Sequence, residues 1–195
     1  MSEVSLTSKL KEILTGLSNK DVDLLAGIGE MKSFRDKDVI LKSGSRLRSV
    51  FLILEGAARG YLLDSEGNQK TILLRGKGIF VGEAKSLFTD TPQKLEIASI
   101  GSTEVLMLSF ADFEKLASEN SAIGQLYLKS LKEAILRLTY LVESMIMMSS
   151  EERYKDLLKM NPTFLEKSYD KYVANFLGIT PVSLSRIKKK LNLEN

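Results

Sequence analysis

The feature that most constrains the fold is a change of hydrophobic period at Ser109. From about residue 30 to residue 108, short runs rich in β-branched and aromatic residues alternate with polar turns that contain glycine, such as Gly76-Lys77-Gly78. Regular short strands with this turn chemistry predict an antiparallel sandwich or barrel. From Ser109 to about Met148 the apolar residues instead recur every three or four positions, which predicts helix. We therefore expect an α+β protein.

Three local signals mark where elements begin and end. Residues 5–29 have helical spacing, and Ser18 or the asparagine after it could cap the second piece of this segment. The clearest hairpin turn is Asp64 to Asn68, because the glycine and the asparagine at its end tolerate a positive φ angle. The run Ser109-Phe110-Ala111-Asp112 fits a capping box at the start of the long helical segment.

The long helix carries apolar residues on two faces. One set follows the alternating spacing of four and three that defines a heptad seam: Tyr127, Leu131, Ala134, Leu138, Leu141, Met145 and Met148. A second set repeats every seven residues beside it: Leu128, Ile135 and Val142. One face can pack on the strand-rich part, but the chain offers nothing to cover the other. The alternative is a helix buried in its own domain; we favour a dimer interface over residues 120–148.

A second unit is expected to follow the long helix. Ser149 and Glu152 again have the spacing of a capping box, and a helix from Arg153 to Met160 should stop at Asn161-Pro162, because proline disfavours helical backbone in the residue before it. We place the domain boundary near residue 149. The predicted domains are therefore residues 1–148, which include the long helix, and residues 149–195.

Residues 170–191 have the pattern of a helix-turn-helix. Asp170 can cap a short helix, and Gly178 ends it as a residue free to adopt a left-handed conformation. Thr180 can cap a second helix, with Pro181 at the first position, where no N–H is needed. The apolar stripe that would face inward from this second helix is Leu184, Ile187 and Leu191. An ordinary helical hairpin is the alternative.

The outer face of that second helix is basic and rich in hydroxyls. Residues 150–195 hold nine Lys and Arg against six Asp and Glu, while the two signs balance in residues 1–149. A solvated helix end would explain this charge, but hydroxyls and an arginine near the start and lysines toward the end suit the major groove and phosphates of DNA. Arg186 is our candidate for reading a guanine or clamping a phosphate. The candidate DNA-contact residues are Thr180, Ser183, Ser185, Arg186, Lys188, Lys189 and Lys190.

Missing residue types exclude several function classes. The chain has no Cys and no His, so disulfides, Cys/His zinc sites, iron–sulfur clusters, His-ligated haem and Ser-His-Asp catalysis are all excluded. Acidic residues show no paired arrangement, and we expect neither an enzyme nor a metal site. The first residues, MSEVSLTSKLKEI, lack the apolar core of a signal peptide, and no run approaches 18 apolar residues. We therefore expect a cytoplasmic protein that has no membrane contact.

The order of a strand-rich domain, a long seam helix and a helix-turn-helix resembles the catabolite-activator-type (Crp/Fnr) family of bacterial transcription regulators. The resemblance spans roughly residues 30–191 and rests on three stretches: FLILEGAARGYLLDSEGNQKTILLRGKGIFVGE, EVLMLSFADFEKL and ANFLGITPVSLSRIKKKL. It implies a cyclic-nucleotide-binding jelly roll as a sensor domain, a dimerising helix and a winged-type helix-turn-helix. It also implies a homodimer that binds a near-palindromic duplex DNA site, with RNA polymerase as a further candidate partner.

The resemblance also implies a ligand site in the jelly roll. Gly82-Glu83-Ala84 matches the opening of the family's phosphate-binding segment, but the arginine that closes this segment is missing, and Lys94 or Gln93 stands near its place. Lysine keeps the charge but loses the planar fork that meets a phosphate with two hydrogen bonds. On the long helix, Thr139 is the polar residue near the expected base position.

We therefore expect cyclic AMP to bind weakly or not at all. The pocket then either holds another small ligand, with a small anion as the candidate, or is vestigial. The predicted function is a dimeric DNA-binding regulator that this ligand controls. The alternative is a cytosolic cyclic-nucleotide sensor that signals through a protein partner.

Overall fold

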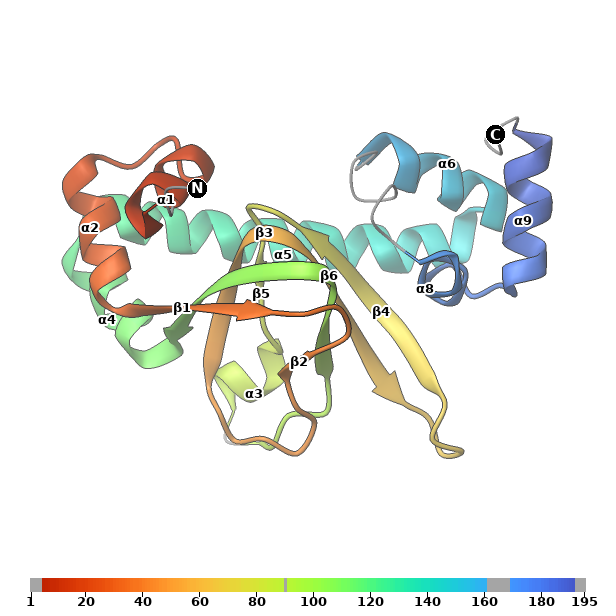
Figure 1. The fold of residues 1–195 in the computed structure, drawn as a ribbon, viewed down its shortest axis with the longest axis horizontal. Helices are drawn as coiled ribbons and strands as arrows, with labels where there is room; N and C mark the ends of the chain where they lie inside the picture. The colour runs from red at the N-terminus through yellow and green to blue at the C-terminus, as the bar shows by residue number, and fades with distance from the viewer. Residues whose placement is uncertain (1–4, 90, 161–168, 192–195) are drawn as a thin grey trace.

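The computed structural model describes residues 5–89, 91–160 and 169–191, and it confirms the α+β class. A rolled sheet lies in the middle, with α1, α2 and α4 at one end and α6, α8 and α9 at the other; α5 runs behind the sheet between the two ends (Figure 1). The helices are α1 (Leu6–Ile13), α2 (Asn19–Gly27), α3 (Ala84–Phe88), α4 (Phe110–Glu119), α5 (Ser121–Met147), α6 (Ser150–Met160), α8 (Asp170–Phe176) and α9 (Pro181–Lys190). The strands are β1 (Gly29–Phe34), β2 (Val39–Leu41), β3 (Ser49–Leu63), β4 (Gln69–Gly76), β5 (Phe80–Val81) and β6 (Glu96–Ser109).

The sheet is built around the antiparallel pair of its two longest strands, β3 and β6. β1 and β2 pair with β6, while β4 and β5 pair with β3, and all of these pairs are antiparallel. Alternate residues of a strand point to opposite faces. Leu52 and Leu106 therefore lie in a core cluster shared with α1, α2, α4 and α5, whereas Ile53 and Val105 lie in a second cluster inside the roll.

The strand boundaries differ from the sequence prediction in three places. The glycines of this region are expected in the turns between short strands, but Gly56 and Gly101 each lie within one long strand. The register of β3 against β6 shifts around Gly56, as in a β-bulge, so the strand bends without ending. β1 was not predicted at all, because its sequence GEMKSF is mostly polar. In the hairpin turn, Gly67 has a φ of 81°, but Asn68 does not take a positive φ.

The helical segment after Ser109 is also divided, where one continuous helix was expected. Asn120 ends α4, and its side-chain Oδ1 accepts a hydrogen bond from the Ile123 N–H (3.1 Å) to cap α5. Its Nδ2 donates to Asp21 Oδ1 of α2 (2.7 Å), which ties the break to the N-terminal helices. The predicted caps at Ser18 and Ser109 are confirmed.

The bulge in β3 gives a stability prediction with a matched control. Gly56 and Gly67 have the same φ of 81°, but a Cβ at Gly56 would lie 2.3 Å from the carbonyl oxygen of Ser102, whereas nothing lies within 4 Å at Gly67. Gly67→Ala should cost about 1–2 kcal/mol for its left-handed backbone. Gly56→Ala should cost about 1–3 kcal/mol more, because a backbone neighbour must move. Urea unfolding measures both, and equal costs would contradict the collision.

Candidate functional site

The helix-turn-helix pattern is confirmed for α8 and α9. The chain turns after Leu177 with Gly178 at a φ of 70°, and the Ile179 N–H donates to the Ala174 carbonyl (2.9 Å). Such a left-handed residue directly after a helix end is the reason for glycine at this position. One detail of the prediction is wrong: the N-cap of α8 is Tyr169, and Asp170 is the first helical residue, with no capping bond from its side chain.

α9 begins and packs as expected. The Thr180 hydroxyl accepts a hydrogen bond from the Ser183 N–H (3.1 Å), and Pro181 stands in the first turn. Leu184 is fully buried in a cluster that joins α6, α8 and α9. Ile187 and Leu191 pack against the same cluster, so the inner stripe is confirmed. α6 begins with the predicted capping box of Ser149 and Glu152, while its predicted stop at Asn161-Pro162 lies outside the described residues.

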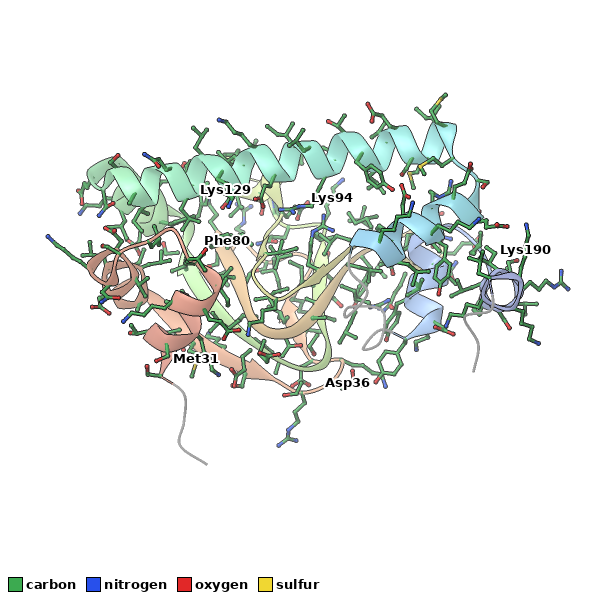
Figure 2. The ribbon with its side chains drawn as sticks, turned by 90° about the horizontal axis from the view of Figure 1, so that it is seen from above. Met31, Asp36, Phe80, Lys94, Lys129 and Lys190 are labelled. Atoms are coloured by element: carbon green, nitrogen blue, oxygen red, sulfur yellow. The ribbon has the colours of Figure 1, made fainter. Side chains whose placement is uncertain are left out.

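The outward face of α9 carries most of the candidate DNA-contact residues. Arg186, Lys189 and Lys190 are exposed, while Ser183, Ser185 and Lys188 are partly buried. Thr180 is exposed, but its hydroxyl is engaged in the cap. Figure 2 shows Lys190 at the end of the molecule that α9 occupies. The face is thus accessible to a large partner.

Two of the three lysines are paired with carboxylates of the same unit. Lys188 Nζ donates to both oxygens of Asp170 (2.6 and 2.7 Å). Lys190 Nζ donates to Glu151 Oε2 of α6 (2.6 Å). Within the described part of the chain, Lys189 has no such carboxylate partner. Lys189 is therefore the lysine most available to an added anion.

α8 is docked on the roll. Tyr172 is buried against Ala57, Leu74 and Ile100. The Arg59 guanidinium lies 3.9 Å from the centre of the Tyr172 ring, a cation–π contact between β3 of the roll and α8. Burial lowers the pKa of Arg59 from its ordinary value. These contacts hold the helix-turn-helix in a defined orientation relative to the roll.

Arg153 of α6 joins the ends of two helices. Its Nη1 donates to the carbonyl of Met148 (2.8 Å), which caps α5, and its Nη2 donates to the carbonyl of Leu177 (2.8 Å), which caps α8. A cation is favourable at a helix C-terminus, because the last carbonyls are unpaired and the helix dipole is negative there. The long helix and the helix-turn-helix are thus connected through one guanidinium.

The expected dimer seam is divided between two environments. Tyr127 packs on Phe113 and donates to Glu114, so much of its surface is covered within its own chain. Leu131, Leu141 and Met148 are partly buried, while Ala134, Leu138 and Met145 are exposed. The neighbouring line of Leu128, Ile135 and Val142 is exposed by 51%, 64% and 51%. Figure 2 shows this long helix along one edge of the molecule, with side chains projecting away from the roll.

The segment that resembles a phosphate-binding site is internally bonded. The Glu83 carboxylate accepts the backbone N–H groups of Lys94 (2.7 Å) and Leu95 (3.1 Å), which ties the start of α3 to the start of β6. Of the two candidates for the closing position, Gln93 is buried and donates to the Leu47 carbonyl (2.6 Å), whereas Lys94 is exposed. This carboxylate therefore already has two donors in the chain itself.

Two cavities lie between the roll and the long helix. The first, the roll cavity, measures about 360 Å³ and is lined by the α1–α2 connection, β4, β5 and α5. The second, the junction cavity, measures about 540 Å³ and is lined by β4, α5, α6 and α8. Of the five predicted ligand residues, Gly82 lines the roll cavity, while Glu83, Ala84, Lys94 and Thr139 line neither cavity.

The described residues contain neither a membrane-spanning helix nor a metal cluster. No helix in residues 5–89, 91–160 and 169–191 is both long and apolar enough to cross a membrane. The same residues contain no cluster of three or more acidic side chains that could hold a metal ion.

Comparison with known proteins supports the fold. Residues 31–120 match the family model described as Cyclic nucleotide-binding domain. FixK2 from Bradyrhizobium japonicum has 18% sequence identity and a TM-score of 0.71, with 85% of each chain covered. A CooA mutant from Carboxydothermus hydrogenoformans has 14% identity and a TM-score of 0.71, covering 98% of this chain and 86% of its own. Catabolite Activator Protein from Thermus thermophilus has 20% identity and a TM-score of 0.52, covering 92% and 86%. No curated protein matches the chain.

These matches define the fold of the protein. Residues 31–120 are similar to a cyclic nucleotide-binding domain, and the chain has the fold of the Crp/Fnr-type regulators. The resemblance noted from the sequence is therefore confirmed at the level of fold. The matched family model describes a binding domain, in agreement with the expectation that the chain is not an enzyme.

The residues that connect the roll, the long helix and the helix-turn-helix were not predicted from the sequence. Arg153 was assigned only to a helix, and Arg59 and Arg75 were not singled out. A signal was present, since Arg75 follows the apolar run Thr71-Ile72-Leu73-Leu74, where a charge is out of pattern. The role of this arginine depends on which residues pack against the strand, and these residues cannot be identified from the sequence.

The ion pairs of Glu151 with Lys155 and Lys190 predict that the stability of the fold depends on pH. Hydrogen bonds from Lys155 and Lys190 lower the pKa of Glu151 to about 2, from an ordinary value of 4.5. A lowered folded-state pKa contributes stability above pH 4.5, and this contribution is lost as the pH falls from 4.5 toward about 2. Glu151→Gln should therefore lose less stability than the wild type over this window in urea unfolding. The difference should shrink in about 1 M salt, which screens exposed pairs. Parallel profiles of wild type and variant would contradict this role.

Proposed function

We propose that the protein is a dimeric regulator that binds duplex DNA through α9 and is controlled by a small ligand. The observation that carries the proposal is the outward face of a capped, well-packed second helix of a helix-turn-helix, which presents Arg186 and Lys189 to solvent. Such a helix can enter the major groove with its N-terminal residues toward the base edges.

The roles along α9 follow from distance and charge. Arg186 offers a planar fork of donors, which suits the two acceptors of a guanine or a phosphate. Ser183 lies in the first turn of the helix and Ser185 at the start of the second, and both can contact bases or phosphates. Lys188, Lys189 and Lys190 anchor the phosphate backbone, which gives affinity without sequence preference.

The dimer is proposed to form along α5. The exposed and partly buried apolar side chains of α5 suggest an interface that draws on both apolar sets. Its residues follow spacings of three and four: Leu128, Leu131, Ile135, Leu138, Val142 and Met145. A parallel pair of such helices buries these side chains as in a coiled coil. It also presents two copies of α9, so the target is a near-palindrome with half-sites about 34 Å apart.

The first test concerns DNA. A preferred duplex is first selected from a random pool and its affinity is measured by gel shift at several salt concentrations. Arg186→Ala should cost about 1–3 kcal/mol on that duplex and relax its sequence preference. Lys189→Ala should weaken binding to all duplexes alike and reduce the salt slope by about one.

Lys132→Ala is the matched control, because it removes an exposed lysine from α5, away from α9, and should leave DNA affinity unchanged. Affinity that does not change with salt would exclude DNA as the partner. That result would favour the alternative, a sensor that acts on a protein.

The second test concerns the dimer. Ile135→Lys and Leu138→Lys should each give a monomer, because a charge would be buried in an apolar interface. Glu143→Lys also places a lysine on α5, but at an exposed position that is already charged and lies outside the proposed line, so it should leave the dimer intact. Sedimentation at micromolar concentration measures all three. A wild-type monomer under these conditions would refute the interface.

A further inference from the structure

Arg75 of β4 has no carboxylate partner among the residues that the structure describes. Its side chain is partly buried, and its Nη1 donates to the carbonyl of Leu74 (2.9 Å). Among the residues that the structure describes, no carboxylate bonds to Arg75. Burial and the nearby charge of Arg137 lower the pKa of Arg75 to about 10, so it is still protonated at neutral pH. Placing a charge in such surroundings without a partner is costly.

Arg137 of α5 faces the same place. Its Nη2 pairs with Glu133 (2.9 Å) one turn away on the same helix, and its charge still acts on Arg75. The two guanidiniums line both the roll cavity and the junction cavity, together with Leu73 and Ala134. Two like charges held together beside empty space repel each other, and an anion between them would remove both the repulsion and the desolvation penalty.

The charge of the surrounding wall also favours an anion. Lys129 adds a third cation to the roll cavity, against the single carboxylate of Glu133. Arg153 lines the junction cavity, and no Asp or Glu of the described chain lines it. The remaining wall of the junction cavity is largely apolar, with Ile72, Ile79, Leu138, Leu141, Met145, Leu157 and Phe176.

We propose that Arg75 and Arg137 form a binding site for a small organic dianion, a phosphomonoester or a dicarboxylate, whose apolar body fills the junction cavity. Guanidiniums meet the oxygens of either group with paired, charge-assisted hydrogen bonds. This site is separate from the Glu83 segment, whose carboxylate is bonded to the chain itself.

The position of the site connects it with the DNA-binding unit, an inference that rests on the proposed function. The junction cavity is lined by Arg75 of β4, Leu138 of α5, Leu157 of α6 and Phe176 of α8. A ligand there touches the roll, the long helix and the helix-turn-helix together. It therefore binds one relative orientation of these parts better than others, and shifts the population toward that orientation.

The experiment compares phenyl phosphate and phthalate as probes, by thermal shift and calorimetry near neutral pH. Phenol supplies the apolar body without charge, and inorganic phosphate supplies the charge without the body. We expect one or both dianions to stabilise the wild type more than phosphate does, and phenol to have no effect; which dianion binds distinguishes a phosphate from a carboxylate. Arg75→Gln and Arg137→Gln should each weaken binding by about ten- to hundredfold.

Two controls keep the result interpretable. Lys132→Gln removes an exposed charge from α5 that lines neither cavity, and should bind the probe as the wild type does. Without probe, Arg75→Gln should melt no lower than the wild type, because it removes an unpaired, partly buried cation. A lower melting temperature would show that Arg75 serves the structure, and would overturn the proposal.

The remaining outcomes separate this site from the proposed function. If the wild type binds DNA but neither dianion stabilises it more than phosphate does, or if both Gln variants bind the probes unchanged, the site is refuted and an adventitious ion only is indicated. If the probes bind with the expected dependence on Arg75 but the chain does not bind duplex DNA, the site stands and the DNA-binding function falls. If both the probes and duplex DNA bind, a gel shift with and without probe measures whether the dianion changes the affinity for DNA.

Discussion

The antiparallel pairing of β3 with β6 is the interaction on which the rest of the structure depends. Every other strand hydrogen-bonds to one of these two, and their alternating side chains supply both core clusters of the roll. β6 leads directly into α4, and Asn120 then starts α5. The direction of the long helix, and hence the place of the helix-turn-helix at its far end, is therefore set where β6 leaves the sheet (Figure 1).

The elements with strong local signals could be predicted from the sequence. Caps at Ser18, Ser109 and Thr180 and the left-handed Gly178 depend on chemistry within a few residues, and each is confirmed. Elements that depend on distant partners could not. β1 is mostly polar and exists because it pairs along the end of β6, and the glycines inside β3 and β6 have the local appearance of turns but lie in bends of continuous strands.

The candidate site divides in the same way. The outward residues of α9 follow from helical spacing and from one buried stripe, so sequence reasoning could place them. The cavity residues are contributed by β4, α5, α6 and α8, which lie far apart in the chain. From periodicity alone, Arg75 and Arg137 would be predicted as two unrelated surface charges. Only their packing across the gap between strand and helix makes them a pair, and the domain boundary near residue 149 likewise stays a prediction.

The ion pairs of α9 have a consequence for how tightly the helix holds nonspecific polyanions. Asp170 and Glu151 occupy Lys188 and Lys190 before any partner arrives. A phosphate that takes either lysine must displace a tethered carboxylate, which then attracts a cation from solution. The two carboxylates thus act as competitors built into the protein. In the proposed DNA complex, fewer counterions would be released on net than the number of lysines suggests, so weak contacts at random sequences would be suppressed more than contacts reinforced by base recognition.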